Sequence, residues 1–216
     1  WRRIRRHYLA SLAFIDEQVG RVLDYLQEND LEKDTTIVFT SDHGDMLGDH
    51  QLPTKGAWHF DACMRVPLII AGPGVMCGHS TDRVVTNLDL FPTLLDMTNV
   101  ECDIPVEGDS LLPLITESAE PARPDAALVE TYGSYGQMDY ALRARTVVTP
   151  SARLTMFGDK RCMLFDTNSD PDETVNMQGR PGYGPLECEL KELMLEMIER
   201  QYRPLPETHR HPYASH

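Results

Sequence analysis

The sequence TIVFTSDHG, residues 36–44, joins a strand pattern to a polar end and is the strongest indication of the fold. Residues 34–40 are rich in β-branched side chains and lack polar alternation, which is typical of a strand buried on both faces in a parallel sheet. Asp42, His43 and Gly44 follow where this strand is expected to end. Ligands of open α/β sheets bind at the carboxyl ends of the strands, so this position favours a functional site.

The segments on either side of this strand complete the pattern of an open α/β sheet. Over residues 8–26, apolar side chains recur every three or four positions, which predicts a helix that faces the core. A second buried strand is predicted at residues 66–71, and a helix at residues 88–97 with Asp89 as its N-cap. A further strand of this sheet is expected at residues 126–131.

Beyond about residue 138 the sequence pattern changes to short runs separated by turn residues, which predicts a second, smaller domain. Short runs separated by turn residues are typical of an antiparallel meander, and they occupy residues 140–148, 153–157 and 162–165. Apolar residues between Leu186 and Tyr202 indicate a last helix. We therefore predict the α/β class: an open, mostly parallel sheet flanked by helices over residues 1–138, and a small antiparallel sheet plus helix over residues 139–216.

The composition of the 216 residues, 41% hydrophobic and 25% charged, is that of a globular chain with a core. A net charge of −14 argues against nucleic acid or an anionic membrane surface as a partner. No apolar run reaches the roughly 18 residues of a membrane span. The five cysteines are scattered and odd in number, so we interpret them mostly as reduced thiols. This leans towards a reducing compartment or a bacterial source, without deciding between cytoplasm and periplasm.

The loop after the first strand is densely charged, because TSDHGDMLGDHQLPTKG contains three aspartates, two histidines and one lysine. A carboxylate and a neutral imidazole both bind divalent cations, so Asp42 and His43 are candidate metal ligands. Neighbours in an extended strand point to opposite faces, and both reach one ion only if the backbone turns at Gly44. Two ligands do not fill a sphere of about six to eight. Asp45 and Asp49 are possible contributors that we interpret as solvated loop carboxylates.

Lys55 lies on a short loop between a proline and a glycine, close in sequence to the expected metal ligands. A lysine in this place can neutralise an anionic ester oxygen, because its ammonium is a compact point charge. Lys55 is therefore a candidate catalytic and substrate-binding residue. His50 and His59 are further catalytic candidates, because a histidine can donate a proton. The alternative is that they are polar loop residues without a catalytic role.

These residues and their surroundings resemble the sulfatase family of the alkaline phosphatase superfamily. Each similar segment is weak alone, but the segments follow one another in the family's order. They are YLASLAFIDEQVGRVLDYL (8–26), TIVFTSDHG (36–44), the lysine at 55, RVPLIIAGPG (65–74), DLFPTLL (89–95), EGDSLL (107–112) and LFDTNSDPDET (164–174).

The resemblance implies a hydrolase of sulfate esters that acts at one divalent cation. It implies that Asp42 and His43 bind the cation and that Lys55 contacts the anionic group of the substrate. Calcium is the cation expected first, with manganese or another divalent ion as the alternative, because an imidazole ligand tolerates softer ions. The fold implied for residues 1–138 is the C-terminal part of the sulfatase α/β domain.

One part of the family's pattern is missing from this sequence. Sulfatases have a formylglycine nucleophile, made from a cysteine or serine in a Cys/Ser-x-Pro/Ala-x-Arg motif, after a pair of metal-binding aspartates. None of the five cysteines lies in that motif, and the sequence contains no Asp-Asp dipeptide. We therefore expect formylglycine outside this chain, in a missing N-terminal portion of the same enzyme. That portion is the expected partner of this chain. The chain alone is expected to be inactive.

The expected substrate is a small anionic ester, namely the sulfate ester of a sugar or an aryl alcohol. Two alternatives remain open. The first is a phosphonate monoester or phosphodiester hydrolase of the same superfamily, which shares the metal scaffold and the anionic substrate. The second is a metal-binding module without catalytic activity, which would keep the scaffold and lack the nucleophile.

Overall fold

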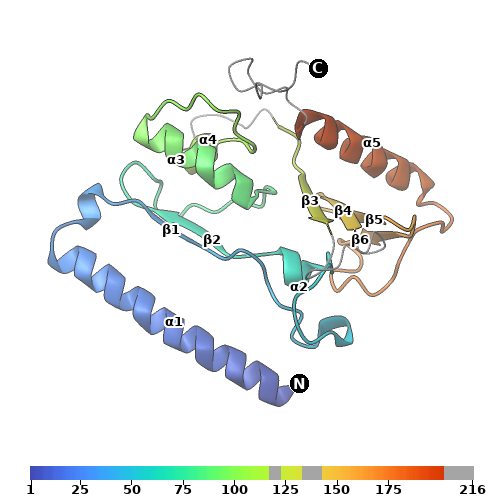
Figure 1. Cartoon of the computed structure of the whole chain (residues 1–216), viewed down its shortest axis with the longest axis horizontal. Coiled ribbons are helices and arrows are strands. Elements are labelled where there is room, and N and C mark those ends of the chain that lie inside the picture. The colour runs from blue at the N-terminus through green and yellow to red at the C-terminus, as the bar shows by residue number, and fades with distance from the viewer. Residues whose placement is uncertain (117–122, 133–142, 202–216) are drawn as a thin grey trace, which may run out of the picture. The chain divides into compact units, whose positions relative to one another are not determined.

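A computed structural model describes residues 1–116, 123–132 and 143–201 (Figure 1). The chain forms two compact units, Trp1–His79 and Ser80–His216, and each is described by itself. None of the helices in the described residues combines the length and the apolar character that crossing a lipid bilayer requires.

The first unit contains a long helix and two strands. In chain order its elements are α1 (Arg2–Glu28), η1 (Glu32–Asp34), β1 (Ile37–Thr40), η2 (Asp49–Gln51), α2 (Asp61–Met64) and β2 (Leu68–Ala71). Both strands lie where the sequence predicts them, but they pair antiparallel, with Ile37 opposite Ala71 and Thr40 opposite Leu68. The parallel arrangement expected for this pair is wrong, because the connection contains only the four-residue helix α2 and no crossover helix.

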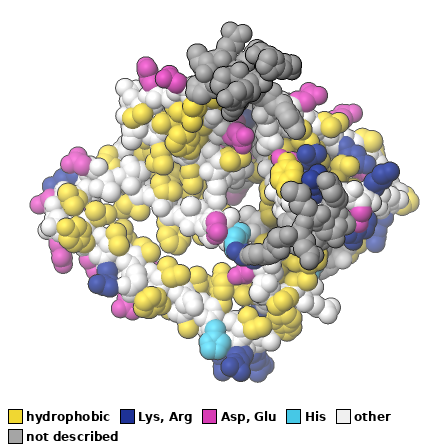
Figure 2. Space-filling model, in the orientation of Figure 1, with side chains coloured by type: hydrophobic (Ala, Val, Ile, Leu, Met, Phe, Trp, Pro, Cys, Tyr) yellow, Lys and Arg dark blue, Asp and Glu magenta, His cyan; other side chains and the backbone are white. Residues whose placement is uncertain are grey.

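The apolar faces of the first unit are largely exposed. α1 forms where the periodicity predicts a helix, yet it has no buried residue, and Figure 2 shows hydrophobic side chains on the surface along it. Its exposed large apolar side chains are Ile4, Leu9, Leu12, Phe14, Ile15, Val22, Leu23 and Tyr25. Phe39 of β1 and Ile69 of β2 are 39% and 60% exposed. We expected α1 to face the core and β1 to be buried on both faces. Both predictions are wrong for the described residues, because no helix or strand among these residues covers the apolar side chains of α1 and β1.

The second unit contains a four-stranded antiparallel sheet in the order β3-β4-β5-β6, with α5 on one face (Figure 1). Its elements are η3 (Asn87–Asp89), α3 (Leu90–Thr98), α4 (Leu112–Ile115), β3 (Ala127–Tyr132), β4 (Arg143–Val148), β5 (Ala152–Phe157), β6 (Cys162–Asp166) and α5 (Gly184–Gln201). Leu154 and Leu164 of the sheet pack with Leu190 and Met194 of α5 in a buried core. The α/β class and the small antiparallel sheet plus helix are thus confirmed.

The strand predicted at residues 126–131 belongs to this second sheet and not to the sheet of the first unit. It forms β3, which pairs with β4 so that Leu128 lies opposite Val147. Both side chains belong to the core under α5, which explains the pairing. The predicted domain boundary between residues 138 and 139, residues 140–142 of the predicted strand and Tyr202 lie outside the described residues. The predicted boundary stays a prediction.

Asp89 is a buried anchor and not only a helix cap. α3 begins directly after it, as predicted, but the Asp89 side chain makes no capping hydrogen bond to α3. Its carboxylate accepts the backbone N–H groups of Thr86 at 2.7 Å and Asp109 at 2.9 Å, and it pairs with Arg123 at 2.8 Å. Because Asp89 is completely buried, these contacts offset the loss of hydration of its charge.

All five cysteines are free thiols, in agreement with the sequence prediction. Cys63 is buried, whereas Cys77, Cys102 and Cys188 are exposed. Burial, together with the charge of Glu187, raises the pKa of the Cys162 thiol. Cys162 is therefore less reactive than an exposed cysteine, because the thiolate is the nucleophilic form.

A buried ion pair between β5 and the turn-rich segment after β6 provides a test of the second unit. Arg153 Nη1 lies 2.8 Å from Glu173 Oε1, and the side chains are 4% and 2% exposed. Glu173→Gln removes the carboxylate charge that Arg153 faces, so we expect the free energy of unfolding to fall by about 3–5 kcal/mol. Urea denaturation of the complete protein measures this change.

The control for this substitution is Glu196→Ala, which breaks an exposed pair on α5 with a 3.9 Å separation from Arg200. Exposed pairs contribute at most about 1 kcal/mol, so this variant should unfold almost like the unaltered protein. Equal losses in the two variants would contradict the importance of the buried pair.

Candidate active site

All the candidate site residues lie in residues 41–60, which follow β1 and are called the site loop below. The start of this loop is fixed to α2, because the backbone N–H of Gly44 donates to the carbonyl of Cys63 at 2.8 Å. The hydroxyl of Ser41 donates to the carbonyl of His43 at 2.9 Å, and Met46 is completely buried. The first residues of the loop are thus held by hydrogen bonds and by packing.

Gly44 is required at the turn for a steric reason. It is not among the residues with positive φ, so the conformational freedom expected for it from the sequence is not what the turn uses. A Cβ at this position would lie 2.1 Å from the carbonyl oxygen of Ala62 in α2. Only glycine therefore lets the backbone that bears Asp42 and His43 approach α2 this closely.

Three of the predicted site residues, Asp42, His43 and Lys55, lie together at the end of β1. The Nζ of Lys55 is 2.6 Å from Nε2 of His43, and Oδ2 of Asp42 is 3.5 Å from the same nitrogen. Nδ1 of His43 is 2.8 Å from the carbonyl oxygen of Gly44. A carbonyl only accepts and an ammonium only donates, so Nδ1 carries the proton and Nε2 presents its lone pair. This neutral tautomer is the one in which Nε2 can bind a metal.

The carboxyl group of Asp42 is ionised at neutral pH. Desolvation raises its pKa, but the hydrogen bond from the backbone N–H of His43 and the nearby positive charge of Lys55 outweigh this effect and lower the pKa. Oδ1 accepts the His43 N–H at 3.0 Å, and the side chain is 84% exposed. Asp42 therefore presents a charged and accessible oxygen ligand next to the imidazole.

Asp45 and Asp49 differ from each other in their surroundings. Oδ1 of Asp45 accepts the backbone N–H of Lys55 at 2.7 Å, so Asp45 is engaged within the loop and is not the solvated carboxylate that we expected. Asp49 is exposed, and its carboxylate contacts Arg5 of α1 at 3.3 Å. Arg5 also donates from Nε to the carbonyl of Leu47 at 2.8 Å, which ties the N-terminal end of α1 to the loop.

His50 and His59 have different surroundings from the group of Asp42, His43 and Lys55. The ring of His50 stacks on Phe60, with 3.8 Å between centroids and 12° between planes. His59 is buried, with 6% of its surface exposed. The catalytic role predicted for each of them stays a prediction.

Asp42 and His43 suit a divalent cation by the chemistry of their donor atoms, one anionic oxygen and one imidazole lone pair. Within the described residues, no cluster of three or more His, Cys, Asp or Glu side chains is arranged to hold a metal ion. That Asp42 and His43 bind a cation stays a prediction.

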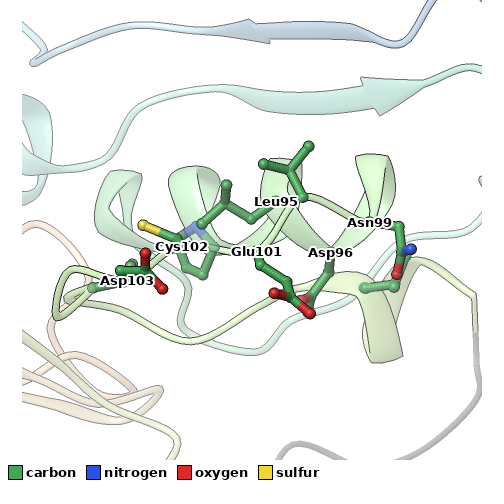
Figure 3. Close-up of a pocket in the computed structure, with 10 residues that line it drawn as sticks. Leu95, Asp96, Asn99, Glu101, Cys102 and Asp103 are labelled. Atoms are coloured by element: carbon green, nitrogen blue, oxygen red, sulfur yellow. The ribbon is translucent and has the colours of Figure 1, made fainter.

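A shallow pocket in the second unit does not include any of the predicted site residues. It lies beside α3 and the segment that follows it, and Figure 3 shows Leu95, Asp96, Asn99, Glu101, Cys102 and Asp103 around it. Three carboxylates, those of Asp96, Glu101 and Asp103, line this pocket. An acidic pocket disfavours an anionic ester, so it is not the candidate site.

A family model, curated relatives and solved structures all match this chain to the same family. The sequence model described as Sulfatase matches residues 2–100. Arylsulfatase K of Gallus gallus is 34% identical over 186 residues, which covers 82% of this chain and 34% of that protein. A structure solved in complex with its substrate D-glucosamine-2-N,6-O-disulfate has a TM-score of 0.81 at 30% identity and covers 91% of this chain and 41% of that one.

A phosphonate monoester hydrolase of Agrobacterium radiobacter is similar to the same degree in structure. Its TM-score is also 0.81, at 28% identity, and the match covers 87% of this chain and 40% of that chain. The chain spans about a third of the length of the curated relatives it matches.

The close approach at Gly44 predicts that Gly44→Ala distorts the site. The added methyl group collides with the Ala62 carbonyl, so we expect the free energy of unfolding to fall by about 1–3 kcal/mol. The control is Gly20→Ala in α1, where nothing lies within 4 Å of the added carbon. That change should stabilise the helix by about 0.5–1 kcal/mol. Urea denaturation measures both, and a neutral Gly44→Ala would contradict the steric account.

Proposed function

We propose that this chain, which belongs to the sulfatase family, supplies part of the active site of a metal-dependent sulfuric ester hydrolase. The observation that carries the proposal is the convergence of three groups at the carboxyl end of β1. The Lys55 ammonium, the His43 imidazole and the Asp42 carboxylate meet at Nε2 of His43, with separations of 2.6 and 3.5 Å. An anionic and a neutral metal ligand beside a cationic side chain suit a site that binds an anionic ester.

In this proposal, Asp42 and His43 hold one divalent cation, with calcium expected first and manganese or another divalent ion as the alternative. When bound, such a cation supplies Lewis-acid stabilisation of negative charge on the ester oxygens. Nε2 of His43 has a single lone pair, so Lys55 cannot keep its bond to Nε2 when that nitrogen is a ligand. Lys55 is then available to neutralise a non-bridging oxygen of the substrate.

The charge of the chain makes Lys55 more important. With a net charge of −14, the chain repels an anionic substrate at long range. Local positive charge must overcome this repulsion, and Lys55 is the lysine that lies beside the candidate metal ligands. We propose that Lys55 is both a catalytic and a substrate-binding residue. The sulfate ester of a sugar or an aryl alcohol is the proposed substrate class, supported by the sulfated sugar named for the similar structure.

We further propose that the rest of the site lies in an N-terminal portion of the same enzyme. Two ligands are too few for a cation that takes about six to eight, and the sequence has no motif for the formylglycine nucleophile. The exposed apolar side chains of α1, β1 and β2 are surfaces that such a portion would cover. The longer curated relatives also support it. By this proposal the chain alone is inactive.

A phosphonate monoester or phosphodiester hydrolase of the same superfamily is the second candidate. The observation that favours it is the phosphonate monoester hydrolase with a TM-score of 0.81, equal to that of the sulfated-sugar complex. The same cation and the same lysine would serve a phosphoryl oxygen. If the remainder of the protein contains no nucleophile, this chain is instead part of a metal-binding module without catalytic activity.

Lys55→Ala tests the proposal in the complete enzyme, expressed with the coding sequence that precedes this chain. Losing one positioned donor to a developing anion should lower kcat/KM by about a hundredfold to a thousandfold. The assay compares an aryl sulfate with an aryl phosphodiester and an aryl phosphonate monoester, and the substrate with the highest kcat/KM decides between the two enzyme candidates.

The control for Lys55→Ala is Lys33→Ala, which removes an exposed lysine that contacts Asp30 at 3.1 Å on the surface. This control should leave kcat/KM unchanged. An unchanged rate in Lys55→Ala would remove Lys55 from the site, and inactivity of the complete enzyme on all three esters with calcium or manganese present would sink the proposal.

A further inference from the structure

Asp45 makes a contact that connects two separate parts of the site loop. Its Oδ1 accepts the backbone N–H of Lys55 at 2.7 Å, across ten positions of sequence. The donor is the backbone amide of the same residue whose ammonium lies 2.6 Å from His43. The contact therefore fixes the backbone from which the Lys55 side chain extends.

The two ends of this contact are held differently. Asp45 lies between Gly44, whose N–H is bonded to Cys63 at 2.8 Å, and Met46, which is completely buried. Lys55 lies in a segment without helix or strand, and the residues from Pro53 to Gly56 are exposed. Asp45 thus belongs to the part of the loop that is fixed to α2. Its carboxylate links this part to the backbone of Lys55.

The chemistry of the contact suits a fixed link. A carboxylate that accepts a backbone N–H forms a charge-assisted hydrogen bond, which is stronger than one between neutral groups. A displacement of about 1 Å in a group that stabilises the reaction can lower the rate about a hundredfold. We propose that Asp45 is a positioning residue, which places Lys55 for the substrate anion and does not itself touch substrate or cation. This inference rests on the proposed function of Lys55.

Two substitutions of Asp45 separate positioning from charge. Asp45→Asn keeps a carbonyl oxygen of the same shape that can accept the Lys55 N–H, whereas Asp45→Ala removes the acceptor. In the complete enzyme we expect kcat/KM to fall by about tenfold to a hundredfold for Asp45→Ala and by less than about fivefold for Asp45→Asn. Asp34→Ala, which removes an exposed carboxylate from η1, is the matched control and should leave kcat/KM unchanged.

A double-mutant cycle shows whether Asp45 acts through Lys55. If it does, Asp45→Ala lowers kcat/KM by less than about twofold in a protein that already contains Lys55→Ala. A structural role independent of Lys55 would give the same loss in both backgrounds and would overturn the inference. Equal losses for Asp45→Asn and Asp45→Ala, together with weaker binding of calcium, would also overturn it, because they would make Asp45 a metal ligand.

Hydrogen exchange supplies a measurement that does not depend on activity. The Lys55 amide should exchange more than about tenfold faster in Asp45→Ala than in the unaltered protein or in Asp34→Ala, because an exposed amide without its acceptor is open to water. Unaltered exchange in Asp45→Ala would overturn the positioning inference alone. Failure of the proposed function has a different signature, namely an unchanged kcat/KM in Lys55→Ala with faster exchange in Asp45→Ala.

Discussion

The close packing of Gly44 against α2 is the constraint on which the candidate site depends. No side chain fits between the Gly44 backbone and the Ala62 carbonyl, and the Gly44 N–H is bonded to the Cys63 carbonyl at 2.8 Å. The turn after β1 is consequently fixed, and with it the positions of Asp42 and His43. Because the carbonyl of Gly44 also accepts Nδ1–H of His43, the same glycine sets the tautomer that leaves Nε2 able to bind a metal.

Local sequence patterns predict where helices and strands form, but they predict less well which segments these helices and strands pack against. The helix around residues 8–26, the strand that ends at Thr40 and the meander with its final helix follow from periodicity, which is a property of a single segment. Pairing direction and burial depend on other segments. The periodicity of α1 predicts an apolar face correctly, but whether that face is covered depends on residues elsewhere, and the described ones do not cover it. In the same way, Leu128 joins the sheet under α5 because its neighbour is Val147, which no local pattern specifies.

For the site, the sequence identifies candidate residues that lie together in the structure, and it misses the contacts that hold them in place. Asp42, His43 and Lys55 are recognisable from residue type and from the family's motif, and they lie together in the structure. The contact of Asp45 with the Lys55 amide could not be predicted, because it joins two loop positions with no periodic relation. The reason for Gly44 was also inaccessible, since it depends on the approach of α2, whose position the sequence does not specify.

A crystal structure of the complete enzyme, grown with calcium and inorganic sulfate, tests the central claim most directly. The account predicts a cation bound by the Asp42 carboxylate and by Nε2 of His43, with the Lys55 ammonium turned from the imidazole to a sulfate oxygen. The remaining ligands should come from residues outside this chain. A cation bound away from Asp42 and His43, or a Lys55 that stays on His43 while sulfate binds elsewhere, would contradict it.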